Sequence, residues 1–227
     1  MIVRFLKQLA PEIIKGRFSA LKNFRYYGPW KSSQESNSMV DRKPCLTYEA
    51  MDIINNYITP KARVFEYGGG GSTLYFTDRA AEVVTVEHNP NWWDKITQAV
   101  TASKWTGKLL QPTREKNEKD PSDPANYSSA EKFGTYREYA SYIDNYGDEY
   151  FDIVMVDGRS RPSCIKHSLP KLKTGGLLIV DDVYRDYYLP HFKEILEKNF
   201  QQLCFLPGPV PYYNFFGQTG VWKKLKN

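Results

Sequence analysis

A short apolar run that ends in four consecutive glycines is the feature that most constrains this chain. Residues 63–67 read Arg-Val-Phe-Glu-Tyr, residues 68–71 are all glycine, and Ser72 follows. An apolar run closed by a glycine cluster is typical of a buried strand that turns sharply. A helix predicted from Ser72 to about residue 80 would direct amide groups and a positive dipole end at this turn. The turn is therefore a candidate site for an anionic ligand, and a tight turn without a ligand is the alternative.

The same alternation of strand and helix continues along the chain and predicts an α/β fold. Predicted strands cover residues 63–67, 83–87, 151–156 and 175–180, and predicted helices cover residues 47–58, 72–80, 90–101 and 162–173. Such alternation implies a doubly wound, mostly parallel sheet. The C-terminal part predicts a helix over 189–200 and strands near 203–206 and 220–222, which fit an antiparallel hairpin that closes the sheet.

Acidic residues stand where the predicted strands end. Ligands of a doubly wound sheet bind at the carboxyl ends of the strands, where the strand order reverses. Glu87 ends the second strand 21 positions after Glu66, where a carboxylate can accept hydrogen bonds from both ribose hydroxyls of an adenosine cofactor. The fourth strand ends in Asp157 and the fifth in Asp181 and Asp182. A solvated glutamate at the strand end is the alternative for Glu87.

Four segments resemble the motifs of class I S-adenosylmethionine-dependent methyltransferases. Residues 64–72 resemble the acidic, glycine-rich first motif of that family, and residues 84–87 resemble its second motif. Residues 152–157 and 175–182 are similar to the fourth-strand motif and to the fifth strand that contains Gly-Gly. The resemblance covers roughly residues 47–225. It implies a Rossmann-like, seven-stranded, mostly parallel sheet and S-adenosyl-L-methionine as the cofactor.

The resemblance also implies roles for individual residues. Gly68 and Gly70 are expected to approach the methionine portion of the cofactor, Glu66 to order its ammonium group, and Glu87 to bind the ribose. The expected cofactor-binding residues are Glu66, Gly68, Gly69, Gly70, Ser72, Glu87, His88 and Asp157. The expected catalytic residues at the methyl-transfer edge are Asp157, Asp181 and Arg159. Ser72 departs from the family pattern, since a third glycine is common there.

A metal ion is a further expectation that the resemblance carries. Asp157, Asp181 and Asp182 resemble the carboxylates that bind a divalent ion in catechol-type and sugar O-methyltransferases, and three oxygen donors suit Mg²⁺. Arg159 and Arg161 follow closely in the sequence. They either pair with these aspartates or clamp an anionic substrate with their guanidinium groups.

The N-terminal residues predict a basic extension. Residues 2–25 place apolar residues at near-helical spacing with basic residues such as Arg17 among them, and a polar linker is predicted over 31–41. Residues 1–63 contain 11 Lys or Arg against 5 Asp or Glu, whereas the rest of the chain is nearly neutral. The helix either packs on the protein's own surface or contacts a membrane surface or a protein partner. We assign residues 1–46 to this extension and 47–227 to a methyltransferase domain.

Residues 111–135 are polar and rich in proline, and they are too long for an ordinary connection. They predict either a mobile lid or a disordered insertion.

Composition excludes several other classes of protein. The three cysteines form no C-x-x-C pair, so neither a disulfide framework nor a zinc site is expected. No apolar run is long enough to span a bilayer, and the first residues do not read as a secretory signal, so a cytoplasmic protein is expected. The body lacks basic residues interleaved with aromatic ones, and nucleic acid is therefore not expected as a partner.

The main hypothesis is methyl transfer from S-adenosylmethionine to a hydroxyl group of a small molecule or glycan. An NAD-dependent oxidoreductase is the first alternative, although Thr73 occupies the place of the third glycine in the dinucleotide fingerprint. A non-catalytic binding module on the same fold is the second alternative. The sequence does not identify the acceptor, because acceptor sites in such folds come from variable loops.

Overall fold

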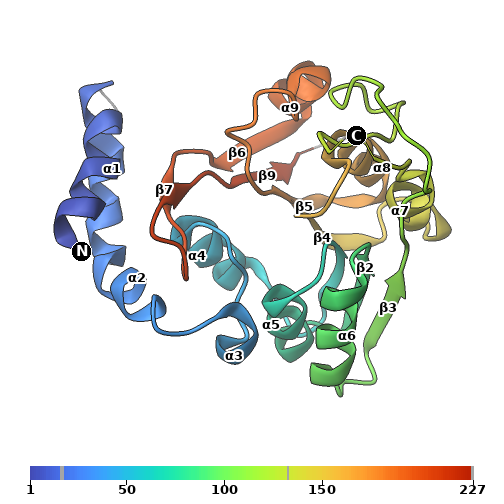
Figure 1. Ribbon diagram of the computed structural model, residues 1–227, viewed down its shortest axis with the longest axis horizontal. Coiled ribbons are helices and arrows are strands. Elements are labelled where there is room, and N and C mark those ends of the chain that lie inside the picture. Colours follow the sequence, from blue (N-terminus) through green and yellow to red (C-terminus); the bar gives the residue numbers. More distant parts are fainter. Residues whose placement is uncertain (16–17, 132, 226–227) are drawn as a thin grey trace.

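A computed structural model describes residues 1–15, 18–131 and 133–225. Within these ranges seven strands form one sheet in the order β3-β2-β1-β4-β5-β9-β6 (Figure 1). The strands are β1 (Arg63–Tyr67), β2 (Glu82–Glu87), β3 (Trp105–Leu109), β4 (Phe151–Val156), β5 (Leu172–Val180), β6 (Phe200–Cys204) and β9 (Gly220–Lys224). The five neighbouring strands β3, β2, β1, β4 and β5 pair in parallel, and β9 runs antiparallel to both β5 and β6. The predicted mostly parallel sheet with a C-terminal antiparallel hairpin is confirmed.

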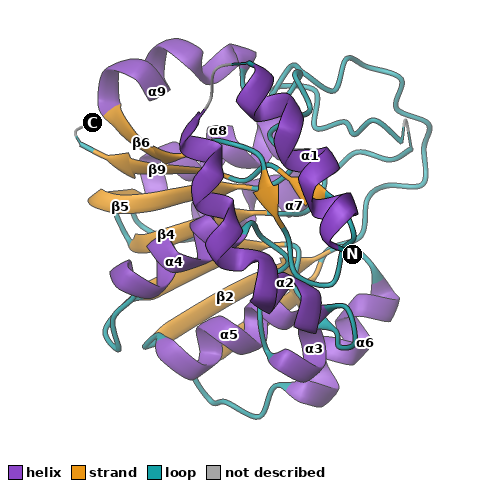
Figure 2. Ribbon diagram, turned by 90° about the vertical axis from the view of Figure 1, so that its left-hand side faces the viewer, coloured by secondary structure: helices purple, strands orange, loops and turns teal. Residues whose placement is uncertain are grey.

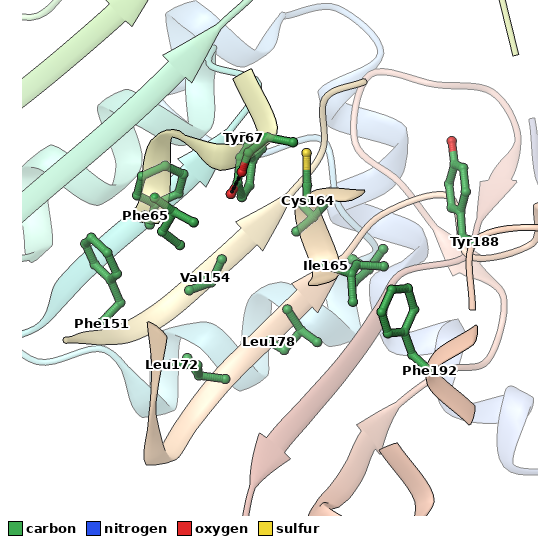
Figure 3. Packing of buried hydrophobic residues seen from close by; sticks show 14 of the residues in the cluster. Phe65, Tyr67, Phe151, Val154, Cys164, Ile165, Leu172, Leu178, Tyr188 and Phe192 are labelled. Atoms are coloured by element: carbon green, nitrogen blue, oxygen red, sulfur yellow. Dashed lines mark hydrogen bonds between the residues drawn. The ribbon is translucent and has the colours of Figure 1, made fainter. Parts of the chain in front are cut away.

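Helices cover both faces of this sheet (Figure 2). On one face lie α4 (Tyr48–Tyr57), α5 (Gly71–Arg79) and α6 (Pro90–Ala99), and on the other lie α7 (Arg137–Ser141), α8 (Arg161–Lys171) and α9 (Lys193–Asn199). Alternate residues of each strand face opposite layers, because side chains alternate along a strand. In β1, Phe65 and Tyr67 pack toward α7 and α8, whereas Val64 packs toward α4 and α5. Figure 3 shows the cluster on the α7 and α8 side, which includes Phe65 and Tyr67 of β1, Val154 of β4 and Ile165 of α8.

Some elements differ from the prediction. The edge strand β3 was not predicted, because its Trp-Thr-Gly-Lys-Leu sequence is short and its burial only alternates between partial and none. The helix predicted over 189–200 is a 3₁₀ turn (Pro190–Phe192) followed by α9, and β6 begins at Phe200 rather than near residue 203. The loop between β6 and β9 carries a small hairpin of its own, formed by β7 (Gly208–Pro209) and β8 (Phe216–Gly217).

The N-terminal extension is helical, but it is not one helix followed by a linker. It contains α1 (Ile2–Ile14), a 3₁₀ segment (Phe18–Tyr26), α2 (Tyr27–Ser33) and α3 (Ser38–Asp41). The predicted linker over 31–41 is thus partly helical, since the Asn37 side chain accepts hydrogen bonds from the amides of Met39 and Val40 and starts α3. Arg17, one of the basic residues of the predicted helix, lies outside the described residues.

This extension packs on the loop that joins β6 to β9. Phe5, Leu9 and Trp30 are buried together, and Phe216 of β8 packs against them. Trp30 Nε1 donates a hydrogen bond of 2.8 Å to the carbonyl of Tyr213. In Figure 1, α1 lies at the far left, with the β7 region between it and the sheet. The division of the chain into two units at residue 46 stays a prediction.

None of the helices in the described ranges combines the length and the apolar character needed to cross a bilayer.

The insertion at residues 111–135 is a folded loop that packs on the body of the protein. Its two ends are joined by backbone hydrogen bonds from Thr113 to Thr135 (3.2 Å) and from Gly134 to Glu115 (2.8 Å). In its middle, Tyr127 is buried in the main core, and its hydroxyl lies 3.1 Å from Nε2 of His167 in α8. The insertion is therefore fixed to α8.

Replacing a buried strand residue tests the core. Leu178 of β5 is fully buried, and Leu178→Ala is expected to lower the free energy of unfolding by about 2–5 kcal/mol through lost burial and a cavity. The matched change Leu6→Ala, at a side chain 43% exposed on α1, should alter it by less than about 0.5 kcal/mol. Urea denaturation measures both values, and equal losses would contradict the assigned core.

Candidate functional site

The glycine turn after β1 is held between the two neighbouring strands. The amide of Gly68 donates to the carbonyl of Val86 in β2 (2.8 Å), and the amide of Asp157 donates to the carbonyl of Tyr67 (2.9 Å). Gly68 has φ +85°, and a Cβ there would lie 2.7 Å from the carbonyl oxygen of Asp157. Only glycine fits this position. Since β1 and β4 are adjacent, the turn lies where the strand order reverses, the usual place for a ligand in such sheets.

Glu66, in β1, supports the glycine turn through hydrogen bonds. Its side chain is fully buried, and its Oε2 accepts hydrogen bonds from the hydroxyls of Thr73 (2.6 Å) and Thr85 (2.9 Å). The Thr73 hydroxyl in turn accepts a bond of 3.1 Å from the amide of Gly70. Burial raises the pKa of Glu66 to about 7, although these hydrogen bonds act in the opposite direction. A chain of contacts therefore links the carboxyl of β1 to the backbone of the turn.

Glu87 organises the next turn, at the end of β2. Its Oε2 accepts from the amide of Gly69 (2.8 Å), and its Oε1 accepts from the amides of His88 (2.8 Å) and Asn89 (2.6 Å). Burial alone would raise the pKa of Glu87, but His88 and these amides outweigh it and the pKa is lowered. Glu87 is therefore a buried anion that ties the glycine turn to the start of α6.

A cavity of about 260 Å³ lies at these strand ends. Its walls are formed by Ser38, Cys45, Gly68, Gly69, Gly70, Gly71, Ser72, Glu87, His88, Asn89, Trp92, Asp157, Gly158, Arg159, Arg161 and Tyr213. Gly70 has extended backbone (φ 168°), and the nearest atom to a Cβ placed there is in the Trp92 ring, 4.0 Å away. A side chain at position 70 would therefore enter open space in front of the turn.

The structure brings most of the predicted site residues together. The cavity walls include Gly68, Gly69, Gly70, Ser72, Glu87, His88, Asp157 and Arg159. Glu66, Asp181 and Asp182 do not form these walls. Glu66 was expected to order the ammonium group of the cofactor directly, but its buried position beneath the turn suits it to hold the turn in shape.

A buried arginine lies among the carboxylates at the ends of β4 and β5. Arg161 Nη2 lies 3.0 Å from Oδ1 of Asp157 and 3.3 Å from Oδ2 of Asp182. Its other donors bind the carbonyls of Gly158 and Asp181. Burial and the charge of Asp181 raise the pKa of Asp157 well above its ordinary range, against the effect of Arg161. Burial likewise raises the pKa of Asp181 to about 6.

The predicted Mg²⁺ site at Asp157, Asp181 and Asp182 is not supported. Among the residues that the structure describes, no three His, Cys, Asp or Glu side chains are grouped as metal ligands would be. Arg161 binds both Asp157 and Asp182, and the hydroxyl of Thr219 donates to Asp181 (2.8 Å). The carboxylates are thus paired with a cation and a hydroxyl, which was the alternative that the sequence left open for Arg161.

Several residues of the site were not predicted. Thr73 served only as evidence against a dinucleotide fingerprint, yet it joins Glu66 to Gly70. Trp92 and Asn89 follow the acidic end of β2 within five positions, and this proximity was a usable signal. Ser38 and Tyr213 come from segments far away in the sequence, and no local pattern marks them.

The pKa of Glu66 predicts how stability depends on pH. The pKa is 4.5 in an ordinary glutamate and about 7 here, so the folded state holds the proton more tightly. The stability that this proton contributes is complete below pH 4.5 and is lost as the pH rises through 7. Between pH 5 and 8 the wild type should therefore lose about 2.5 kcal/mol relative to Glu66→Gln, which does not titrate. Denaturation at both pH values measures this difference, and a constant difference would contradict the assignment.

Comparisons with known proteins give matches in structure only. No protein-family model matches the chain, and no curated protein matches its sequence. An rRNA methylase from Streptococcus thermophilus matches with a TM-score of 0.55 and 14% identity, over 78% of this chain and 95% of that one. The methyltransferase SMU.1697c from Streptococcus mutans, solved in complex with SAH, matches with 0.54 and 14%, over 78% and 96%. NSun6 from Pyrococcus horikoshii, solved with SFG, matches with 0.51 and 10%, over 80% and 53%.

These matches correct the expectation about partners. A small-molecule or glycan acceptor was expected and nucleic acid was not, because the body lacks a basic, aromatic surface. An rRNA methylase shares this fold over almost its entire length, and this match contradicts an expectation that excluded nucleic acid. The expected partner class is therefore wrong. The sheet order, the glycine turn and these matches together show that the chain has the fold of class I S-adenosylmethionine-dependent methyltransferases.

Proposed function

We propose that this chain transfers a methyl group from S-adenosylmethionine, as a cytoplasmic enzyme. One observation carries the proposal: the glycine turn, the ionised Glu87 and the carboxyl of Asp157 line a single cavity where the strand order reverses. A similar structure binds SAH, which supports this choice of cofactor for the cavity.

The walls of the cavity fit the parts of such a cofactor. The amides of Gly68, Gly69 and Gly70 are already engaged within the protein, so the start of α5, from Gly71 on, is the part of the turn that offers backbone amides to a carboxylate. Oε2 of Glu87 accepts one hydrogen bond, from the amide of Gly69. This oxygen can accept a second hydrogen bond, which suits a ribose hydroxyl. Trp92 lies beside Gly70, and its ring offers a flat apolar wall to an adenine base.

For methyl transfer the protein must align the cofactor with the methyl acceptor and supply a group that accepts a proton. S-adenosylmethionine supplies a methyl group that is already activated on a positively charged sulfur, so the transfer depends mainly on alignment. Asp157 lies at the end of β4 in the cavity wall, and its raised pKa makes it a stronger base than an ordinary aspartate. Arg161 holds this carboxylate at 3.0 Å and so fixes its orientation. We propose Asp157 as the group that accepts the proton of the methyl acceptor.

RNA is the acceptor class that we propose to test first. The rRNA methylase with this fold supports this choice. The N-terminal extension, whose net charge is positive, also contributes Ser38 and Cys45 to the cavity wall, and a positive net charge favours contact with the phosphates of RNA.

The NAD-dependent alternative is less well supported by the sheet. Dinucleotide-binding sheets have the order 3-2-1-4-5-6, whereas here the antiparallel β9 is inserted between β5 and β6. Thr73, in the place of the third fingerprint glycine, is engaged with Glu66 and Gly70.

Filling the cavity in front of the glycine turn tests cofactor binding. Calorimetric titration of the wild type with SAH is expected to give one saturable site with micromolar affinity (~10⁻⁶ M). Gly70→Leu should weaken this binding at least about 100-fold, because its side chain would enter the space that the cofactor needs, while the thermal midpoint stays near that of the wild type.

Gly147→Leu is the matched control, since a Cβ at the exposed Gly147 also meets no atom within 4 Å but lies outside the cavity. It should bind SAH as the wild type does. Failure of the wild type to bind SAH at high micromolar concentration would refute the proposed function.

An acceptor assay follows from the same proposal. Incubation with tritiated S-adenosylmethionine and total RNA should label RNA, and Gly70→Leu should abolish the label. If the wild type binds SAH but leaves every RNA fraction unlabelled, RNA is the wrong acceptor and the cofactor assignment stands.

A further inference from the structure

A second, more enclosed cavity adjoins the first one, where the insertion meets the start of α8. It measures about 50 Å³ and is lined by Pro121, Ser128, Ser129, Ala130, Glu131, Gly158, Arg159, Ser160, Arg161, Pro162, Arg185, Tyr187 and Tyr188. A volume of this size holds about three or four water molecules, or one tetrahedral oxyanion. Gly158, Arg159 and Arg161 also line the cofactor cavity. The two cavities are therefore adjacent, and a single acceptor molecule can place one group here and another near Asp157.

Three arginine side chains line this second cavity, namely those of Arg159, Arg161 and Arg185. The cavity also touches the first turn of α8, an 11-residue helix that begins at Arg161. Guanidinium groups and the amides at the start of a helix are hydrogen-bond donors, so the wall is suited to a ligand rich in acceptor oxygens.

The three arginines at this cavity differ in how firmly they are engaged. Arg161 is buried and binds two carboxylates and two carbonyls. Arg185 lies 3.3 Å from Asp182. Arg159 pairs at 2.5 Å with Glu131 of the insertion, whose side chain is 55% exposed.

Arg159 is therefore the arginine that a ligand can recruit. Exposed ion pairs contribute little to stability, because water screens them and ordering both side chains costs entropy. A doubly charged oxyanion can replace the Glu131 carboxylate on Arg159 at small cost. The guanidinium of Arg159 thus already pairs with an oxyanion, the carboxylate of Glu131, and a phosphate group can present its oxygens to Arg159 in the same way.

We propose that the second cavity binds a terminal phosphate group of the methyl acceptor, with Arg159 as its main cationic partner. The inference rests on the proposed function, because it places the rest of the acceptor in the cofactor cavity near Asp157. The enclosed shape of the cavity favours a phosphate monoester over a phosphodiester, which needs two open ends.

Equilibrium dialysis with radiolabelled inorganic phosphate tests the site directly, with the full chain and without a methylation assay. The wild type is expected to bind one phosphate per chain. Arg159→Gln should weaken binding at least tenfold, and Glu131→Gln should strengthen it several-fold by removing the internal competitor. Arg4→Gln, in the exposed and most basic part of the chain, is the matched control and should change nothing.

The opposite directions of these two variants separate the inference from simple loss of folding. Phosphate binding that Arg159→Gln leaves unchanged, or that Glu131→Gln weakens, would overturn the inference. A nucleoside 5′-monophosphate should compete with the label, and competition by a dinucleotide with only an internal phosphodiester but not by the monophosphate would also overturn it. SAH titration in the same samples distinguishes the two proposals: a chain that binds SAH but not phosphate refutes only the phosphate site, and a chain that does not bind SAH refutes the proposed function.

Discussion

The structure depends on how the end of β1 is fixed. Hydrogen bonds to β2 and β4 hold Tyr67 and Gly68 in place on both sides, and Glu66 is fully buried directly beneath the turn that follows. The Thr73 hydroxyl links the Glu66 carboxyl to the amide of Gly70 through hydrogen bonds. The glycine backbone of the turn therefore keeps its shape although it has no side chains. The cavity in front of it is therefore preorganised, which reduces the conformational entropy that the protein loses when a ligand binds.

The carboxyl groups around the cavity are kept in different states by their surroundings. Glu87 receives three backbone amides and has a lowered pKa, whereas burial dominates at Glu66 and Asp157 and raises theirs. In the proposed function, this contrast separates Glu87, the anion that binds the cofactor, from Asp157, the base that accepts a proton. Arg161 binds both Asp157 and Asp182 and so allows the carboxylates at the ends of β4 and β5 to lie close together.

The sequence predicted the parts of the fold that local patterns determine. The strands β1, β2, β4 and β5 are rich in apolar residues, and glycines and acidic residues mark their ends, so much of the cavity wall was found from the sequence. The edge strand β3 was missed because one side of it is exposed. Ser38, Tyr213 and the pairing of Arg159 with Glu131 depend on contacts between distant segments, and single-residue patterns do not contain them.

A crystal structure of the chain soaked or grown with S-adenosylhomocysteine tests the central claim most directly. The account predicts density for the ligand against the glycine turn, with the ribose at Glu87, the adenine beside Trp92 and the sulfur facing Asp157. Density at another place on the chain, or a cavity that stays free of ligand at saturating concentration, would contradict it.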